Sequence, residues 1–316
     1  MTADPPQLVL RHAAAQYLAL RRRLGFKLVT QGKLLWSFIA HTETEGAAHI
    51  TADSAVAWAY ATSSTDPSYV AARLSVVRGF ACHLAAFDPA TQIPPARLPA
   101  GRSGPRRSAP FVYSPGQIGQ LMRVARTRPT AWHRRVLPVI IGLMAATGMR
   151  ISEVISLDCG DVDLDGRVLI VTGKNNRLRD VVMHPTTAVA LRGYRTDRDA
   201  RFPRPADPAF FLNDRGRRVT RAAVECEFRT LVRLTGIHTD PTRRAPRLHD
   251  LRHTMSVTTL IDWYRAGIDI DASLPRLSAY LGHVSPKSTY WYYLQATPEL
   301  LALAAGRLCQ FGNEHP

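Results

Sequence analysis

The chain has 316 residues, of which 46% are hydrophobic, and this is enough for two globular domains that each bury a core. Its 41 lysines and arginines outnumber 25 aspartates and glutamates, and the resulting net charge of +16 favours a polyanionic partner, most simply nucleic acid. The longest apolar run, residues 136–147, is too short to span a bilayer and the N-terminus lacks the apolar core of a signal peptide, so we expect a soluble, cytoplasmic protein without a membrane partner.

Residues 7–88 show apolar residues at the spacing of helices. Helices are expected over residues 8–23, 30–44, about 52–61 and 66–87. Thr51 or Asp53 is a candidate cap for the third helix, and Asp66 followed by Pro67 starts the fourth. The pattern predicts a compact helical bundle as a first domain, residues 1–88. Most arginines of this domain are expected to form a solvated surface, and one face of the bundle that carries them could bind DNA.

Residues 89–110 interrupt the helical pattern with six prolines, which exclude a continuous helix. The segment also contains Arg102, Arg106 and Arg107, and its stretch GRSGPRRSAP has no acidic residue. We interpret it as an extended basic linker. It is either an inert surface tether or a strand of chain that follows a phosphate backbone.

Residues 111–316 are expected to form a second domain, mainly α-helical with one small antiparallel sheet. Ser114 and Pro115 have the residue types of a helix cap and first turn. A buried helix is expected over about residues 132–146, and another starts at residue 151. Gly148 ends the first of these two helices, which leaves Arg150 at their junction.

The alternating segment 163–183 predicts two strands joined by a tight turn at residues 173–176, with Lys174 at the tip of the hairpin. Residues 209–212 are expected to add one short strand. Helices are expected over residues 219–234, 249–266 and about 298–311.

The stretch RLHDLRHT places His249 and Arg252 three residues apart, so both side chains lie on one face of a helix. A guanidinium is permanently charged and binds phosphate oxygens in a forked geometry, and an imidazole can exchange a proton near neutral pH. The pair therefore suits a phosphoryl group that undergoes transfer, although the same residues also occur at ordinary solvated helix starts.

The four cysteines, at positions 82, 159, 226 and 309, are scattered and form no CxxC pair. Neither a zinc site nor a redox motif is predicted. We expect reduced, buried or half-buried thiols and no metal or other cofactor.

Four segments together resemble the tyrosine recombinases, the phage-integrase and Xer-like family: ATGMRISEVISL, TGKNNRLRDVV, LHDLRHT and YLGHVSPKSTYWYY. They occur in the order and spacing of that family over about residues 111–295. The residues that match the family's active site are Arg150, Lys174, His249, Arg252, His283 and Tyr292. Tyr290 and Tyr293 are neighbouring alternatives for the nucleophile, and the spacing of nine residues from His283 favours Tyr292.

The resemblance implies a two-domain architecture in which the helical bundle is a core-binding domain on DNA. It implies that Tyr292 attacks the scissile phosphate and forms a 3′-phosphotyrosine, with Arg150 and Arg252 on the non-bridging oxygens and no required metal. Lys174 would protonate the leaving 5′-oxygen, His249 would assist removal of the tyrosine proton, and His283 would bond the phosphate. Pro286 and the aromatic cluster after it resemble integrases of bacterial transposable elements.

The expected partner is double-stranded DNA carrying paired recombination sites, on the bacterial nucleoid. The resemblance implies a homo-tetramer that acts through a Holliday junction, or a hetero-oligomer with related recombinases, joined by the helix at about residues 298–311. Candidate DNA contacts outside the active site are Arg102, Arg106, Arg107, Arg243 and Arg244. Two other functions remain open: a DNA-binding accessory protein of the same fold, which has no need of Lys174 or Tyr292, and a type IB topoisomerase-like enzyme that acts alone on one duplex.

Overall fold

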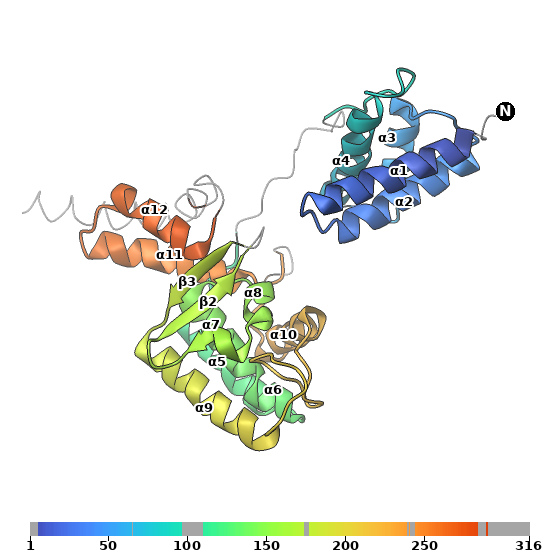
Figure 1. The fold of residues 1–316 in the computed structure, drawn as a ribbon. Helices are drawn as coiled ribbons and strands as arrows, with labels where there is room; N and C mark the ends of the chain where they lie inside the picture. Colours follow the sequence, from blue (N-terminus) through green and yellow to red (C-terminus); the bar gives the residue numbers. More distant parts are fainter. Residues whose placement is uncertain are drawn as a thin grey trace, which may run out of the picture. The chain divides into compact units, whose positions relative to one another are not determined.

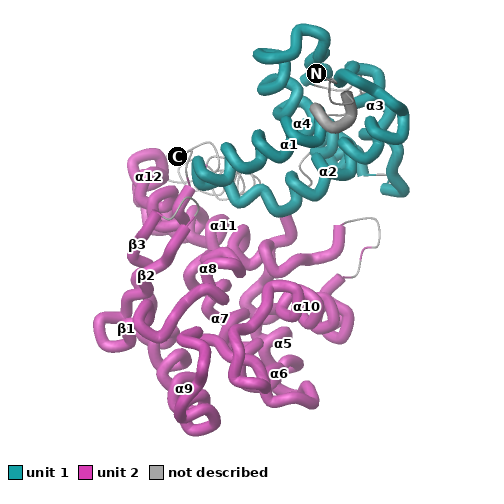
Figure 2. Tube along the Cα trace, turned by 45° about the vertical axis from the view of Figure 1, so that its right-hand side comes forward, with its two compact units in different colours: residues 1–107 teal, residues 108–316 magenta. Residues whose placement is uncertain are grey.

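The structure is a computed structural model that describes residues 6–64, 66–96, 110–173, 177–238, 240, 244–283 and 289. The chain divides into two compact units, residues 1–107 and 108–316, which Figure 2 colours separately. Residues 97–109 of the predicted linker (residues 89–110) and the predicted helix at residues 298–311 lie outside the described residues.

The first unit contains helices α1 (Pro6–Arg23), α2 (Val29–Thr44), α3 (Ala52–Tyr60) and α4 (Pro67–Leu84). Two caps follow from the sequence: the hydroxyl of Thr51 accepts the backbone N–H of Ser54, and the carboxylate of Asp66 accepts that of Ser68. Apolar residues at helical spacing meet in one core, with Phe38 and Phe80 fully buried. The predicted helical bundle is confirmed, although its fourth helix ends before residue 87.

The helices described in the second unit are α5 (Pro115–Arg126), α6 (Ala131–Arg135), α7 (Leu137–Thr147), α8 (Ile151–Ser156), α9 (Pro185–Arg201), α10 (Arg221–Thr235), α11 (Asp250–Arg265) and α12 (Ile270–Leu281). Helix α7 is the central one, because its apolar residues are buried and it packs against α5, α6, α9 and α11. Helix α12 lies beside α11 and strand β3 (Figure 1). No helix in the described ranges is long and apolar enough to cross a bilayer.

A small antiparallel sheet has the order β1 (Val162–Asp163), β2 (Val168–Thr172) and β3 (Leu178–Val182) in the described part of the unit. Leu169, Val171 and Val181 are buried, while the neighbouring positions Ile170, Thr172, Asp180 and Val182 are exposed. Arg179, two residues before Val181, therefore points toward the body of the unit. The predicted combination of helices with one small antiparallel sheet is confirmed.

Three details of the predicted elements differ. The single helix over residues 132–146 is wrong, because the chain breaks at Val136 between α6 and α7, where Pro138 lacks the N–H that a continuous helix needs. Residues 209–212 form no strand, only isolated bridges from Ala209 to Asp158 and from Leu212 to Arg218. Helix α9 was not predicted.

The thiols also differ from expectation. Cys159 is half-buried, as expected, but Cys82 and Cys226 are exposed.

Candidate active site

The site begins where α7 ends. Gly148 adopts a left-handed conformation, with φ of 64°, and terminates α7, and α8 starts at Ile151 after only two further residues. A Cβ atom at position 148 would also lie 3.0 Å from Leu281 and 3.1 Å from Met255, so a larger residue is disfavoured by crowding as well as by the backbone conformation. This tight junction places Arg150 at the N-terminus of α8, as the sequence predicts.

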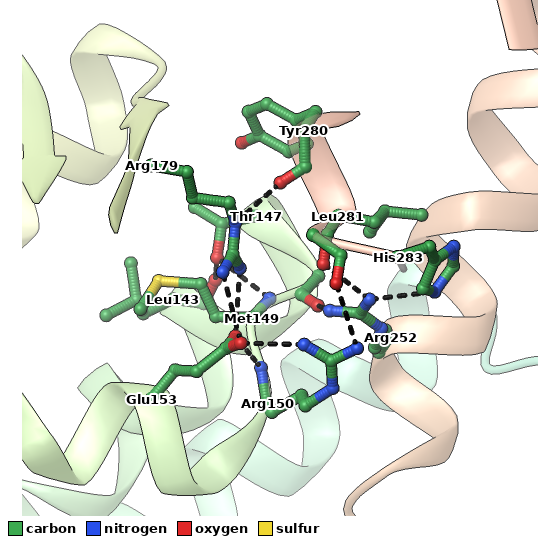
Figure 3. A network of polar contacts seen from close by, with 12 residues as sticks. Leu143, Thr147, Met149, Arg150, Glu153, Arg179, Arg252, Tyr280, Leu281 and His283 are labelled. Atoms are coloured by element: carbon green, nitrogen blue, oxygen red, sulfur yellow. Dashed lines mark hydrogen bonds and ion pairs between the residues drawn. The ribbon is translucent and has the colours of Figure 1, made fainter. Parts of the chain in front are cut away.

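The Arg150 side chain keeps 33% of its surface exposed, and its Nη1 atom donates to Glu153 Oε1 at 2.7 Å (Figure 3). Glu153 also accepts the backbone N–H of Arg150 at 2.9 Å. A second arginine, Arg179 of β3, donates to both oxygens of the same carboxylate, at 3.1 and 2.9 Å. Glu153 therefore holds two guanidinium groups from different elements.

Burial disfavours the negative charge of Glu153, which is only 4% exposed, but the hydrogen bonds from Arg179 and Arg150 outweigh burial and lower its pKa below the ordinary value. Glu153 is ionised at neutral pH, and this network orients Arg150.

Arg252 lies deeper than Arg150, since it is only 1% exposed. Its Nη1 atom donates to the carbonyl of Gly148 at 2.7 Å, and its Nη2 atom donates to the carbonyl of Leu281 at 2.7 Å and to His283 Nε2 at 2.9 Å. Helix α11 thereby joins the end of α7 to the end of α12 through one side chain.

His283 follows α12 and is half-buried. Its Nε2 atom must accept the bond from Arg252, because a guanidinium only donates. Its Nδ1 atom therefore carries the proton and donates to the hydroxyl of Thr289 at 2.8 Å. Burial and the positive charges of Arg252 and Arg150 lower the pKa of His283 to about 3, so the ring is neutral at pH 7.

His249 is the residue immediately before α11 and is exposed at the surface. Its ring packs edge-to-face against the ring of His253, with 4.8 Å between the two ring centroids. Burial of its inner side, followed by the charges of Arg252, Arg247 and Arg150, lowers its pKa to about 4. The predicted common face of His249 and Arg252 exists, but the imidazole lies at the surface and the guanidinium lies beneath it.

His249 and Arg150 both line an open hollow of about 520 Å³. The other residues that line it are Ile151, Ser152, Arg221, Glu225, Phe228, Arg229, Arg247 and Leu248. Four of the lining side chains are arginines and one is acidic, and that carboxylate is already engaged by Arg221 at 2.7 Å. The surplus of positive charge suits a polyanion such as a phosphodiester backbone.

The structure thus brings together four of the predicted site residues: Arg150, His249, Arg252 and His283. Lys174 and Tyr292 lie outside the described residues.

Of the candidate DNA contacts, Arg102, Arg106, Arg107 and Arg243 also lie outside the described residues. Arg244 is described, and it pairs at 3.0 Å with the buried carboxylate of Asp250 at the start of α11. Its contact with DNA remains a prediction.

Sequence reasoning missed Glu153, Arg179 and the arginines of α10. Glu153 had a detectable signal, because a glutamate three residues after a helix cap is typical of a capping box. Arg221 and Arg229, eight positions apart on α10, could have been recognised as a basic stripe on one helix face. Arg179 gave no comparable signal beyond its position on the inward face of a predicted strand.

The chain is similar in sequence and in fold to known integrases and recombinases. Residues 112–299 match the model of the phage integrase family. The chain is 38% identical, over 94% of its length and 96% of the relative, to y4rB of Sinorhizobium fredii, provisionally described as an integrase/recombinase. It is 30% identical to the tyrosine recombinase XerC of Roseiflexus sp., over 71% of this chain and 67% of that one. Its fold resembles the Tn1549 transposon integrase in complex with transposon right end DNA, with a TM-score of 0.66, 16% identity and coverage of 94% and 99% of the two chains.

Proposed function

This chain belongs to the phage integrase family and is a site-specific DNA recombinase of the tyrosine type, and from that premise we propose that it cleaves and rejoins DNA through a 3′-phosphotyrosine intermediate. The observation that supports the proposal most directly is the convergence of Arg150, Arg252 and His283 from three separate segments, with His249 on the wall of the same basic hollow.

In the cleavage step the phenolic oxygen of Tyr292 forms a bond to phosphorus as the bond from phosphorus to the 5′-oxygen breaks. The tyrosine proton passes to His249, and Lys174 supplies the proton that the leaving 5′-oxygen needs. The products are a 3′-phosphotyrosine and a free 5′-hydroxyl, and the reverse step with a 5′-hydroxyl from another duplex rejoins the strand.

The two arginines stabilise the negative charge that shifts onto the non-bridging oxygens in the transition state. Arg150 is already exposed toward the hollow. Arg252 is buried behind it and bonded to backbone carbonyls, so a phosphate must reach it by displacing part of this arrangement.

His249 can act as a base because it is neutral at pH 7. Its pKa of about 4 makes it a weak base in the absence of DNA. A bound phosphodiester brings a negative charge close to the arginines that lower this pKa, Arg252 and Arg247 foremost, and offsets their effect, so the pKa of His249 rises when the substrate is bound.

Exchange between two duplexes requires four cleavable strands and one tyrosine for each. We therefore propose a tetramer on paired DNA sites that passes through a Holliday junction, composed of this chain alone or together with related recombinases. In this assembly the helix expected at residues 298–311 docks on a neighbouring subunit, and the unit of residues 1–107 binds DNA as a core-binding domain.

The test is a covalent-trapping experiment with the full-length chain. A pool of randomised nicked duplexes, in which the short cleaved strand diffuses away, is incubated with the protein, and the strands that remain attached after denaturation are sequenced. The wild type should yield an adduct at a defined sequence, also in the presence of EDTA, and Tyr292→Phe should yield none.

Tyr290→Phe is the matched control, because it removes an equivalent hydroxyl two residues away and should leave the adduct in place. Absence of any adduct with the wild type would refute the recombinase mechanism and favour an accessory DNA-binding role. Loss of the adduct on chelation, with recovery on addition of Mg²⁺, would refute the metal-free chemistry.

A further inference from the structure

Three arginines converge on the C-terminal end of α12 (Figure 3). The carbonyls of Tyr280, Leu281 and Gly282 follow one another along the chain. They accept hydrogen bonds from Arg179 at 2.9 Å, Arg252 at 2.7 Å and Arg150 at 3.4 Å, respectively. The C-terminus of a helix carries the partial negative charge of its exposed carbonyls, so this end is suited to hold cations. His283 follows directly.

Arg179 differs from the other two arginines in the way its donors are used. Its Nε atom binds the carbonyl of Tyr280, and its two terminal nitrogens bind the two oxygens of Glu153. Its side chain is 13% exposed, compared with 33% for Arg150. The guanidinium is therefore engaged on both edges by protein groups and is not directed at a substrate.

These bonds make Arg179 a connection between three parts of the site. Through Glu153 it fixes the carboxylate that binds Arg150, and through Tyr280 it fixes the helix end that provides acceptors for Arg252 and precedes His283. It also belongs to β3, where it pairs with Val171 of β2, in the hairpin closed by the bond from Gly173 N–H to the carbonyl of Arg177.

Gly282 provides the space for this arrangement. A Cβ atom there would lie 2.8 Å from Nη1 of Arg179 and 3.0 Å from its Cζ, inside the contact distance of these atoms. The residue also has φ of 66°, which disfavours any other residue type. Glycine before His283 therefore serves the close approach of Arg179 as well as the end of the helix.

We propose that Arg179 is a positioning residue of the recombination site: it holds the carboxylate of Glu153 and the end of α12 in one arrangement, and so sets the geometry of Arg150 relative to Arg252 and His283. This inference rests on the proposed function. It predicts that Arg179 affects charge stabilisation at the scissile phosphate without contacting the DNA.

The experiment compares Arg179→Met and Arg179→Lys with the wild type in the full-length chain, on the nicked site recovered by covalent trapping. Methionine keeps an unbranched apolar stem but has no guanidinium and no charge, and lysine keeps the charge but cannot bind Tyr280 and both oxygens of Glu153 together. The matched control is Arg218→Met, which removes an arginine bound to the carbonyl of Ile155 and to the carboxylates of Asp158 and Asp207, none of which is a proposed site residue.

The measured quantity is the rate constant of adduct formation at saturating DNA, which is insensitive to the fraction of inactive protein. Arg179→Met should lower it by roughly 10–100-fold, since misplacing a catalytic group by about 1 Å can cost about 100-fold. Arg179→Lys should lie between this variant and the wild type. DNA affinity should change little, and Arg218→Met should cleave at the wild-type rate.

A second substrate separates positioning from general destabilisation. In a methylphosphonate a methyl group replaces one non-bridging oxygen at the scissile position, so the phosphorus centre is neutral and depends less on the arginines. The deficit of Arg179→Met should fall to less than about threefold on this substrate, because the charge that misplaced arginines fail to stabilise is absent. A structural defect would slow both substrates equally.

The outcomes separate the two proposals. If the wild type forms no adduct, the proposed function fails and this inference fails with it. If the wild type cleaves and Arg179→Met cleaves equally fast, or is slowed equally on both substrates, Arg179 does not position the site although the function stands. Failure of both Arg179 variants to melt cooperatively would make Arg179 a folding residue and would also overturn the inference.

Discussion

Glu153 offers the sharpest test of the buried network, because one carboxylate there binds two arginines and is itself 4% exposed. In Glu153→Gln the volume is retained while the charge is lost, which leaves Arg179, only 13% exposed, without its carboxylate partner. Breaking a buried ion pair by removal of one member costs about 3–5 kcal/mol. For a unit of this size each kcal/mol corresponds to about 2–4 °C in Tm, so the unit of residues 108–316 should melt roughly 6–20 °C lower.

The assay is thermal melting followed by circular dichroism, with Glu225→Gln as the matched control. Glu225 binds Arg221 on the surface, with side chains 40% and 63% exposed, and an exposed helical pair of this kind contributes about 0.3–0.5 kcal/mol. The control should therefore melt within about 2 °C of the wild type. Equal melting of the two variants would refute the reasoning that the Glu153 network is buried and stabilising.

The pH dependence provides a second check on the same variant. The folded-state pKa of Glu153 lies below its ordinary value of 4.5, so its ionised form stabilises the folded state. The difference in unfolding free energy between wild type and Glu153→Gln should be complete above pH 5 and shrink as the pH falls through the folded-state pKa. A difference that grows on acidification would contradict the assignment of the charged form.

Further predictions concern catalysis, DNA binding and assembly. Arg150→Ala and Arg252→Ala should each slow adduct formation by roughly 100–1000-fold, the cost of about 2.7–4 kcal/mol for a lost donor, with most DNA affinity retained; cleavage at the wild-type rate by either variant would show the site assignment to be wrong. Replacement of Arg102, Arg106 and Arg107 together by alanine should weaken the salt dependence of DNA binding. The slope of log DNA affinity against log salt concentration, measured by fluorescence anisotropy, should flatten by about 0.9 for each phosphate that these side chains neutralise. An unchanged slope would make this segment an inert tether. Truncation after Thr297 should leave a folded, DNA-binding protein that assembles poorly on site DNA in light scattering; early melting and aggregation would instead identify the helix as part of the intramolecular core.

Local signals in the sequence predicted much of the second unit. Gly148 and the apolar start of α8 define the junction that carries Arg150, and both act within a few residues. The break between α6 and α7 was also visible, since Pro138 stands at a position where a continuous helix needs a donor. Helix α9 was missed although His184 and Pro185 begin it and Ala188, Leu191 and Tyr194 recur at helical spacing.

The depth of each side chain could not be predicted. His249 and Arg252 are three residues apart, and this spacing gives their shared face but not the 1% exposure of Arg252. The partner of Glu153 could not be predicted either, because Arg179 is 26 residues away in the sequence and the chain contains many other arginines. Ion pairs of this kind depend on where β3 packs, which is decided by the whole core rather than by local pattern.

The burial of Arg252 has a consequence for when the site can act. The bonds described for it include those to two backbone carbonyls and to the neutral ring of His283. A phosphodiester oxygen is negatively charged, and a guanidinium can bind two such oxygens side by side, so a phosphodiester adds an ion pair that a carbonyl oxygen does not provide. Under the proposed function, a phosphate bound by the Nη2 atom of Arg252 would compete with its bonds to Leu281 and His283, and both residues lie at the end of α12, before Tyr292 in the sequence. If Tyr292 is the nucleophile, as we propose, this side chain couples phosphate binding to the position of the nucleophile, and cleavage is then favoured when a phosphate is seated between Arg150 and Arg252.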